Sequence, residues 1–63
     1  MKDYWFFVFA SAPNAPCIVQ AIFPPEMLTE ALEFSSEANG YREVRKATWS
    51  FGEVPEYSET ESI

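Results

Sequence analysis

Large apolar side chains dominate two short runs near the start of the chain. Residues 4–9 are aromatic or β-branched throughout, as strands prefer, and the run is too short for an isolated buried helix. Residues 17–23 form the second run, after a segment in which two prolines and an asparagine predict a loop. Two strands joined by a short loop are most simply a β-hairpin.

After the second run, the spacing of the apolar positions becomes that of a helix. Pro24 and Pro25 end the strand, because proline has no N–H to donate to a sheet, and Pro25 suits the first turn of a helix. Over residues 25–38, apolar and small side chains recur every three or four positions and predict one buried helix face. These side chains are Met27, Leu28, Ala31, Leu32, Ser35 and Ala38. Asn39 and Gly40 supply the expected stop, with a left-handed residue just past the helix.

Residues 41–51 read as a third strand, and the character of the chain changes after Gly52. The segment 53–63 is acidic, interrupted by proline and rich in serine, which predicts a flexible tail. We therefore expect a single domain over residues 1–52, followed by an acidic tail.

This order of elements predicts a small α+β domain of the ββαβ type. Strand 1 carries large apolar side chains on both of its faces, so it belongs in the middle of the sheet. We expect a three-stranded antiparallel sheet in the order 2-1-3, with the helix on one face and a right-handed crossover from strand 2 to strand 3.

One helix covers only one face of such a sheet, so the other face is predicted to stay open. Exposed apolar patches of this kind mark interaction sites. The candidate residues on this aromatic face are Trp5, Phe7, Phe9, Ile18 and Ile22. Self-association through this face, or through an edge strand, would give a homodimer and add burial to a small core. The alternative is a packed core whose aromatics are partly covered by the tail or the loop.

The net charge of the chain limits the kinds of molecule that it is expected to bind. The 63 residues include 10 acidic and 4 basic side chains and no histidine, which gives a net charge of −6. Such a chain repels nucleic acid phosphates and anionic membranes, whereas a basic surface on another protein attracts it.

Four glutamates repeat along the predicted helix, opposite its apolar face: Glu26, Glu30, Glu33 and Glu37. Like charges at this spacing destabilise a helix by about 0.2–0.5 kcal/mol per pair, so local stability does not explain the pattern. We expect a negative ridge that binds a basic groove, for example in competition with DNA. The alternative is a solvated face that keeps the protein soluble.

Most of the positive charge lies on the third strand, as Arg42, Arg45 and Lys46. An aromatic sheet beside basic side chains is typical of platforms for single-stranded nucleic acid. Arg42 and Lys46 share one face of the strand and Arg45 has the other, so they form no flat patch. Pairing with the acidic helix or tail is the competing interpretation, and the overall charge favours it.

No residue pattern supports catalysis, a metal site or a cofactor. The chain has no histidine to act as a base and only two glycines, and its single cysteine, Cys17, begins an apolar strand where we expect it to be buried. No run approaches the ~20 apolar residues of a membrane-spanning helix. Asp3 stands where a signal peptide would be positive, so we expect no cleaved leader, and a lone cysteine suits the reducing cytoplasm.

Together these features predict a small acidic protein-binding module that acts by stoichiometric association and is not an enzyme. By analogy, compact acidic chains of this size suit an inhibitor or adaptor of the kind that viruses and phages direct at host machinery. Two alternatives stay open at this point. One is a sheet that binds single-stranded nucleic acid through exposed aromatics with Arg42, Arg45 and Lys46, and the other is a structural subunit of a larger assembly.

Overall fold

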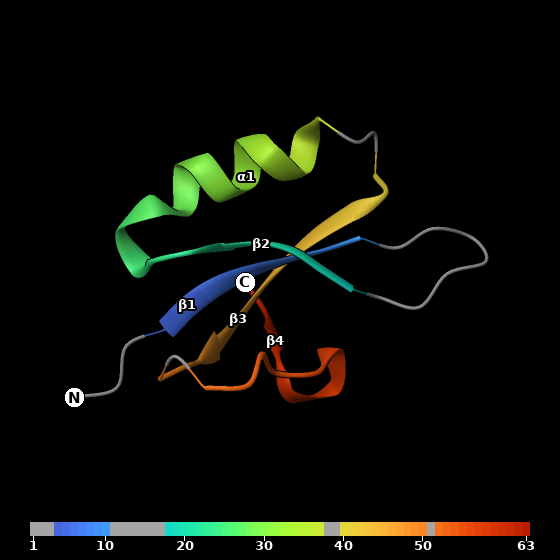
Figure 1. The fold of residues 1–63 in the computed structure, drawn as a ribbon. Helices are drawn as coiled ribbons and strands as arrows, with labels where there is room; N and C mark the ends of the chain where they lie inside the picture. Colours follow the sequence, from blue (N-terminus) through green and yellow to red (C-terminus); the bar gives the residue numbers. More distant parts are fainter. Residues whose placement is uncertain (1–3, 11–17, 38–39, 51) are drawn as a thin grey trace.

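The computed structural model describes residues 4–10, 18–37, 40–50 and 52–63. Its elements in chain order are β1 (Tyr4–Ala10), β2 (Ile18–Phe23), the 3-10 turn η1 (Pro25–Met27), α1 (Leu28–Ser36), β3 (Arg42–Thr48), the 3-10 turn η2 (Tyr57–Glu59) and β4 (Glu61–Ser62). The strands form one antiparallel sheet in the order β2-β1-β3-β4. Helix α1 lies across one face of this sheet, and the C-terminal segment, residues 52–63, passes along the other (Figure 1).

The small α+β fold and the central place of β1 are confirmed, but the prediction of a three-stranded sheet is wrong. A fourth strand pairs with β3, with Ser62 opposite Arg45 and Glu61 opposite Lys46. This strand and η2 both lie in the segment 53–63, for which the sequence predicted a flexible tail. The composition of that segment gave no sign of its order, because side chains of β3 hold it in place.

Strand β1 contributes to two cores, one on each face of the sheet. The core away from α1 contains Phe7, Phe9 and Ala47, with Trp5, Val19, Ile22 and Trp49 packed against them. The core beneath α1 contains Val8, Ala31 and Val44, with Phe6, Ala21, Phe23 and Phe34 packed against them. Because successive side chains of a strand point to opposite faces, a strand that is apolar at every position needs cover on both.

The α-helix spans Leu28–Ser36 and is shorter than the predicted residues 25–38. Pro25 occupies the first position of η1, which leads directly into α1. The helix ends at Ser36, and Gly40 takes the left-handed conformation with φ near +90°, which favours glycine because it has no Cβ. Cys17, expected at the start of the second strand, and Ala38, expected on the apolar helix face, lie outside the described residues.

The stripe that α1 turns towards the sheet differs from the predicted one. Ala31 is fully buried, and Phe34 packs against Phe23 with ring centroids 6.1 Å apart. Leu28 and Leu32, which we expected in the core, are instead 37% and 45% exposed. The small side chain of Ala31 lets the helix lie close to the sheet, and the ring of Phe34 fills one flank. The two leucines are consequently turned towards the opposite flank, where solvent reaches them.

Two substitutions on neighbouring helix positions test this stripe. We expect Ala31→Leu to lower the free energy of unfolding by about 1–3 kcal/mol, because it overfills a closed site. Leu32→Ala should cost less than about 1 kcal/mol, because that side chain is already 45% exposed. Urea unfolding followed by tryptophan fluorescence measures both values, and equal costs at the two positions would contradict the observed stripe.

A truncation tests whether the C-terminal segment belongs to the folded unit. Ending the chain at Gly52 uncovers Phe9, which is 2% exposed, and removes the Thr60 oxygens that accept hydrogen bonds from Arg45. We expect the free energy of unfolding to fall by more than about 2 kcal/mol, the scale of a large core deletion. If the melting temperature were unchanged, the segment would be the dispensable tail that its composition predicted.

Candidate functional site

The acidic helix face is the first candidate surface. Glu26 lies in η1, Glu30 and Glu33 lie in α1, and Glu37 caps its C-terminus; all four are exposed. Glu37 lies 3.8 Å from a guanidinium nitrogen of Arg42, at the limit of an ion pair. Within the described ranges, the other three carboxylates take part in no ion pair. They are therefore available to a partner, as the sequence predicted, although exposure alone does not separate binding from solvation.

Arg42 is used to fasten the helix to the sheet. Its Nη1 donates to the carbonyl of Phe34 at 2.7 Å, its Nε donates to Gln20 Oε1 at 2.9 Å, and the guanidinium lies 4.0 Å from the centroid of the Phe34 ring. The neighbouring Ser35 hydroxyl also donates to the Arg42 carbonyl at 3.1 Å. Arg42 thus ties α1, β2 and β3 together, and its side chain is only 22% exposed.

Arg45 performs the same task on the opposite face, where it holds the C-terminal segment. Its guanidinium donates to the Thr60 hydroxyl, to the Thr60 carbonyl at 2.9 Å, to Glu43 at 2.9 Å and to the Tyr57 hydroxyl at 3.1 Å. It also lies 4.1 Å from the centroid of the Tyr57 ring, and the Tyr57 hydroxyl donates to Glu43 at 2.8 Å. We call these four residues the C-terminal clasp: Glu43, Arg45, Tyr57 and Thr60. The Arg45 guanidinium uses most of its N–H donors within this cluster.

Each of the three basic residues of β3 lies over an aromatic ring of the chain. Arg42 and Lys46 face the helix side and Arg45 the other side, as the strand register requires. The ring beside Arg42 is the half-buried Phe34, whereas Tyr57 beside Arg45 and Tyr4 beside Lys46 are 36% and 47% exposed. The interpretation that paired these side chains within the chain fits this arrangement better, although their partners are mainly rings and carbonyl oxygens.

The aromatic face predicted to be open is largely covered. Phe7 and Phe9 are 0% and 2% exposed, because Trp49 and Tyr57 pack on them edge to face with centroids 5.7 and 5.4 Å apart. Trp5 packs against Trp49 in the same manner, at 5.2 Å. The alternative in which the tail covers these aromatics therefore describes this face. For binding, Trp5 and Ile22 are half-buried and Ile18 is 55% exposed, so a role of these three stays a prediction.

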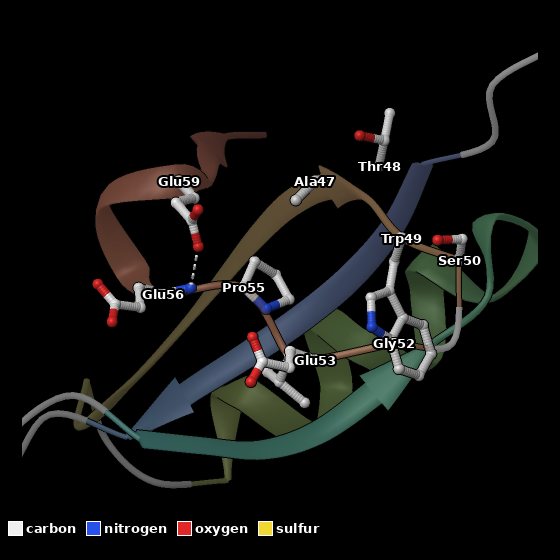
Figure 2. A pocket seen from close by; sticks show the side chains of 10 residues that line it. Ala47, Thr48, Trp49, Ser50, Gly52, Glu53, Pro55, Glu56 and Glu59 are labelled. Atoms are coloured by element: carbon white, nitrogen blue, oxygen red, sulfur yellow. Dashed lines mark hydrogen bonds between the residues drawn. The ribbon is translucent and has the colours of Figure 1, made fainter.

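Two hollows lie beside the C-terminal segment. The acidic recess, of about 940 Å³, is lined by Ala47, Thr48, Trp49, Ser50, Gly52, Glu53, Val54, Pro55, Glu56 and Glu59 (Figure 2). The apolar groove, of about 690 Å³, is lined by Phe9, Ile18, Val19, Val54, Pro55, Glu56, Tyr57 and Ser58. In the acidic recess, the Glu59 carboxylate turns back to accept the Glu56 N–H at 2.8 Å and caps η2 (Figure 2). This carboxylate therefore has a structural role.

The linings of both hollows hold carboxylates, hydroxyls and rings. Across the described ranges, no group of three metal-ligating side chains comes together. The same part of the chain includes no helix long and apolar enough to cross a membrane.

The clasp is a feature that the sequence analysis missed. Its one sequence signal is the spacing of Glu56 and Glu59, which brackets a short turn in the manner of a capping box. That signal predicts a turn but does not reveal that Arg45 holds it.

Substitution of Arg45 tests the clasp. We expect Arg45→Met to lower the free energy of unfolding by about 2–4 kcal/mol, because Glu43 and Thr60 lose charge-assisted hydrogen bonds at a half-buried site. Lys46→Met is the matched control on the same strand: it removes the same charge and, among the residues that the structure describes, a contact over the Tyr4 ring. The control should cost less than about 1 kcal/mol. Equal losses in chemical denaturation would show that Arg45 does not fasten the segment.

Comparisons with protein-family models, with curated proteins and with solved structures each find no match to this chain.

Proposed function

We propose that this chain is a protein-binding module that associates stoichiometrically with a protein bearing a basic surface, as an inhibitor or adaptor. The acidic helix face is its contact surface in this proposal. The observation that supports it is the charge imbalance on α1, where Glu26, Glu30 and Glu33 are exposed and no basic side chain within the described ranges forms an ion pair with them.

The use of the basic residues elsewhere strengthens this imbalance. Arg42 and Arg45 are held by carbonyl oxygens and rings, so they are not free to swing over and neutralise the helix. The net charge of −6 consequently acts outward from a surface carried on a rigid element. Charges arranged in this way mainly raise the rate of association and select the partner, and added salt weakens them.

The alternatives have less support. Binding of single-stranded nucleic acid needs several cations beside exposed rings on one face, whereas Arg45 beside Tyr57 and Lys46 beside Tyr4 lie on opposite faces of the sheet. A structural subunit could use the same acidic surface, and in a capture experiment it would come out with several components in fixed proportion. Self-association is a separate question, because two copies of an acidic helix face repel one another.

Charge reversal on the helix tests the proposal. The immobilised chain is incubated with lysate of its source cells at low and at high salt, and the captured proteins are identified by mass spectrometry. We expect a captured protein with a basic surface whose binding falls at high salt. We expect the Glu30→Lys, Glu33→Lys double variant to capture it about tenfold less well, because each reversal replaces attraction with repulsion.

Glu53→Lys is the matched control, because Glu53 is also exposed but lies in the C-terminal segment away from α1. It should leave capture nearly unchanged, and it is compared with Glu30→Lys alone, which changes the net charge by the same amount, so that the position of the charge is tested separately from its amount. With the captured protein purified, stopped-flow measurements should place the loss in the association rate. If the helix variant bound as the natural chain does, the glutamates would be the solvated face that keeps the protein soluble.

A further inference from the structure

Strand β2 is an edge strand of the sheet that the structure describes. In the strand order it is the outermost member, and within the described ranges it pairs only with β1. Its six residues expose a row of backbone N–H and C=O groups that can pair with another strand. Edge strands are usually protected by lysine, proline or a bulge. From Ile18 to Phe23, β2 contains neither lysine nor proline, but its pairing with β1 does contain a bulge.

The edge is also neutral in a strongly acidic chain. Residues 18–23 carry no charge, whereas the opposite edge of the sheet contains Glu61 and α1 carries the acidic helix face. Like charges placed directly opposite one another destabilise a strand pair. Between the two edges of the sheet, β2 is therefore the one where a second copy can approach without opposed carboxylates in the pair.

Because of a bulge, the side chains of β2 point to the two faces of the sheet in an order that is the same from either end of the strand. Val19 is paired with Phe9, and Ile22 with Phe7, so both lie on the face away from α1. The register shift falls between these pairs and leaves Gln20 as the extra residue. Ile18 and Phe23, at the two ends, share the faces of Ala10 and Phe6, which are on the helix side.

That pattern is what a two-fold antiparallel pair requires. In full pairing of β2 with itself, Ile18 meets Phe23 of the second copy and Val19 meets its Ile22. Residues opposite one another must point to the same face. Without the bulge, a six-residue strand in this register would put opposed side chains on different faces. The apolar groove adds a place for the partner's side chain, because it borders Val19 and is lined by Pro55 and Tyr57.

We propose that β2 pairs in antiparallel fashion with β2 of a second copy of this chain, extending the sheet across a two-fold axis. Ile22 of each copy then lies beside Val19 of the other, at the mouth of the apolar groove. This interface uses backbone hydrogen bonds and uncharged side chains. It is independent of the acidic helix face, and either interaction can fail while the other holds.

The oligomeric state of matched variants tests this pairing. Sedimentation velocity from low to high micromolar concentration should show a dimer of the 7.2 kDa chain that tightens as salt screens the repulsion between acidic copies. Ile18→Glu should raise the dimer dissociation constant by about tenfold or more, because it places a carboxylate in the strand pair. Leu32→Glu is the control: it adds the same charge at a similarly exposed apolar position, 45% against 55%, and should leave the constant unchanged.

Hydrogen exchange on the natural chain gives a readout that needs no variant. Alternate amides of residues 18–23, those on the outer side of β2, should become more protected as the concentration rises, while β4 should not change. A monomer at every concentration would overturn the proposal. So would a dimer that is broken by Leu32→Glu and not by Ile18→Glu, or one without added protection in β2.

Discussion

The rest of this structure depends on strand β1, which has large apolar side chains on both of its faces and must be covered on both. A single nine-residue helix can cover only one of those faces. The other face would leave Phe7 and Phe9 in water unless another part of the chain packed on it, and at about 25 cal/mol per Å² of apolar surface the penalty is severe for so small a domain. The C-terminal segment provides this cover, and edge-to-face packing of Trp49 and Tyr57 closes the core.

The two elements that cover the sheet, α1 and the C-terminal segment, also account for the positions of the two arginines of β3. The helix and the C-terminal segment are both short, so each is fastened by an arginine of β3: Arg42 under the helix and Arg45 under the segment. A guanidinium suits this task, since it stacks on a ring and donates several hydrogen bonds at once. Because Arg42 and Arg45 are used in this way, Glu30 and Glu33 of α1 have no ion-pair partner among the described residues. The acidic surface thus follows from how the fold is held together.

The sequence predicted those parts of the fold that depend on local pattern. The strands, the proline at the helix start, the glycine beyond its end and the central place of β1 could all be inferred from spacing and turn chemistry. The stripe that α1 buries could not, because Leu28 and Phe34 lie on opposite flanks of Ala31 and the spacing alone does not say which flank faces the sheet. Ala31 sets the distance between helix and sheet, since its side chain is the smallest at the point of contact.

The order of the C-terminal segment was hidden for a similar reason. Its composition is that of a solvated tail, and it is held by contacts with distant residues: Arg45 binds Thr60, fifteen residues later in the chain, and the Tyr57 ring packs on Phe9. For the candidate site, the exposure of the four glutamates was predictable from their spacing. The loss of the aromatic face as an open surface was not, because it depends on the same long-range clasp.

The excess of negative charge has opposite effects on binding at the acidic helix face and on pairing at the edge strand β2. Under the proposed function, a partner for the acidic helix face is attracted by the whole charge of the chain, and salt weakens that attraction. A second copy is repelled by the same charge, so pairing of two copies is favoured where the local surface is neutral and the backbone supplies the hydrogen bonds. Residues 18–23 carry no charge and form an edge strand. The two proposed interactions therefore respond to salt in opposite directions.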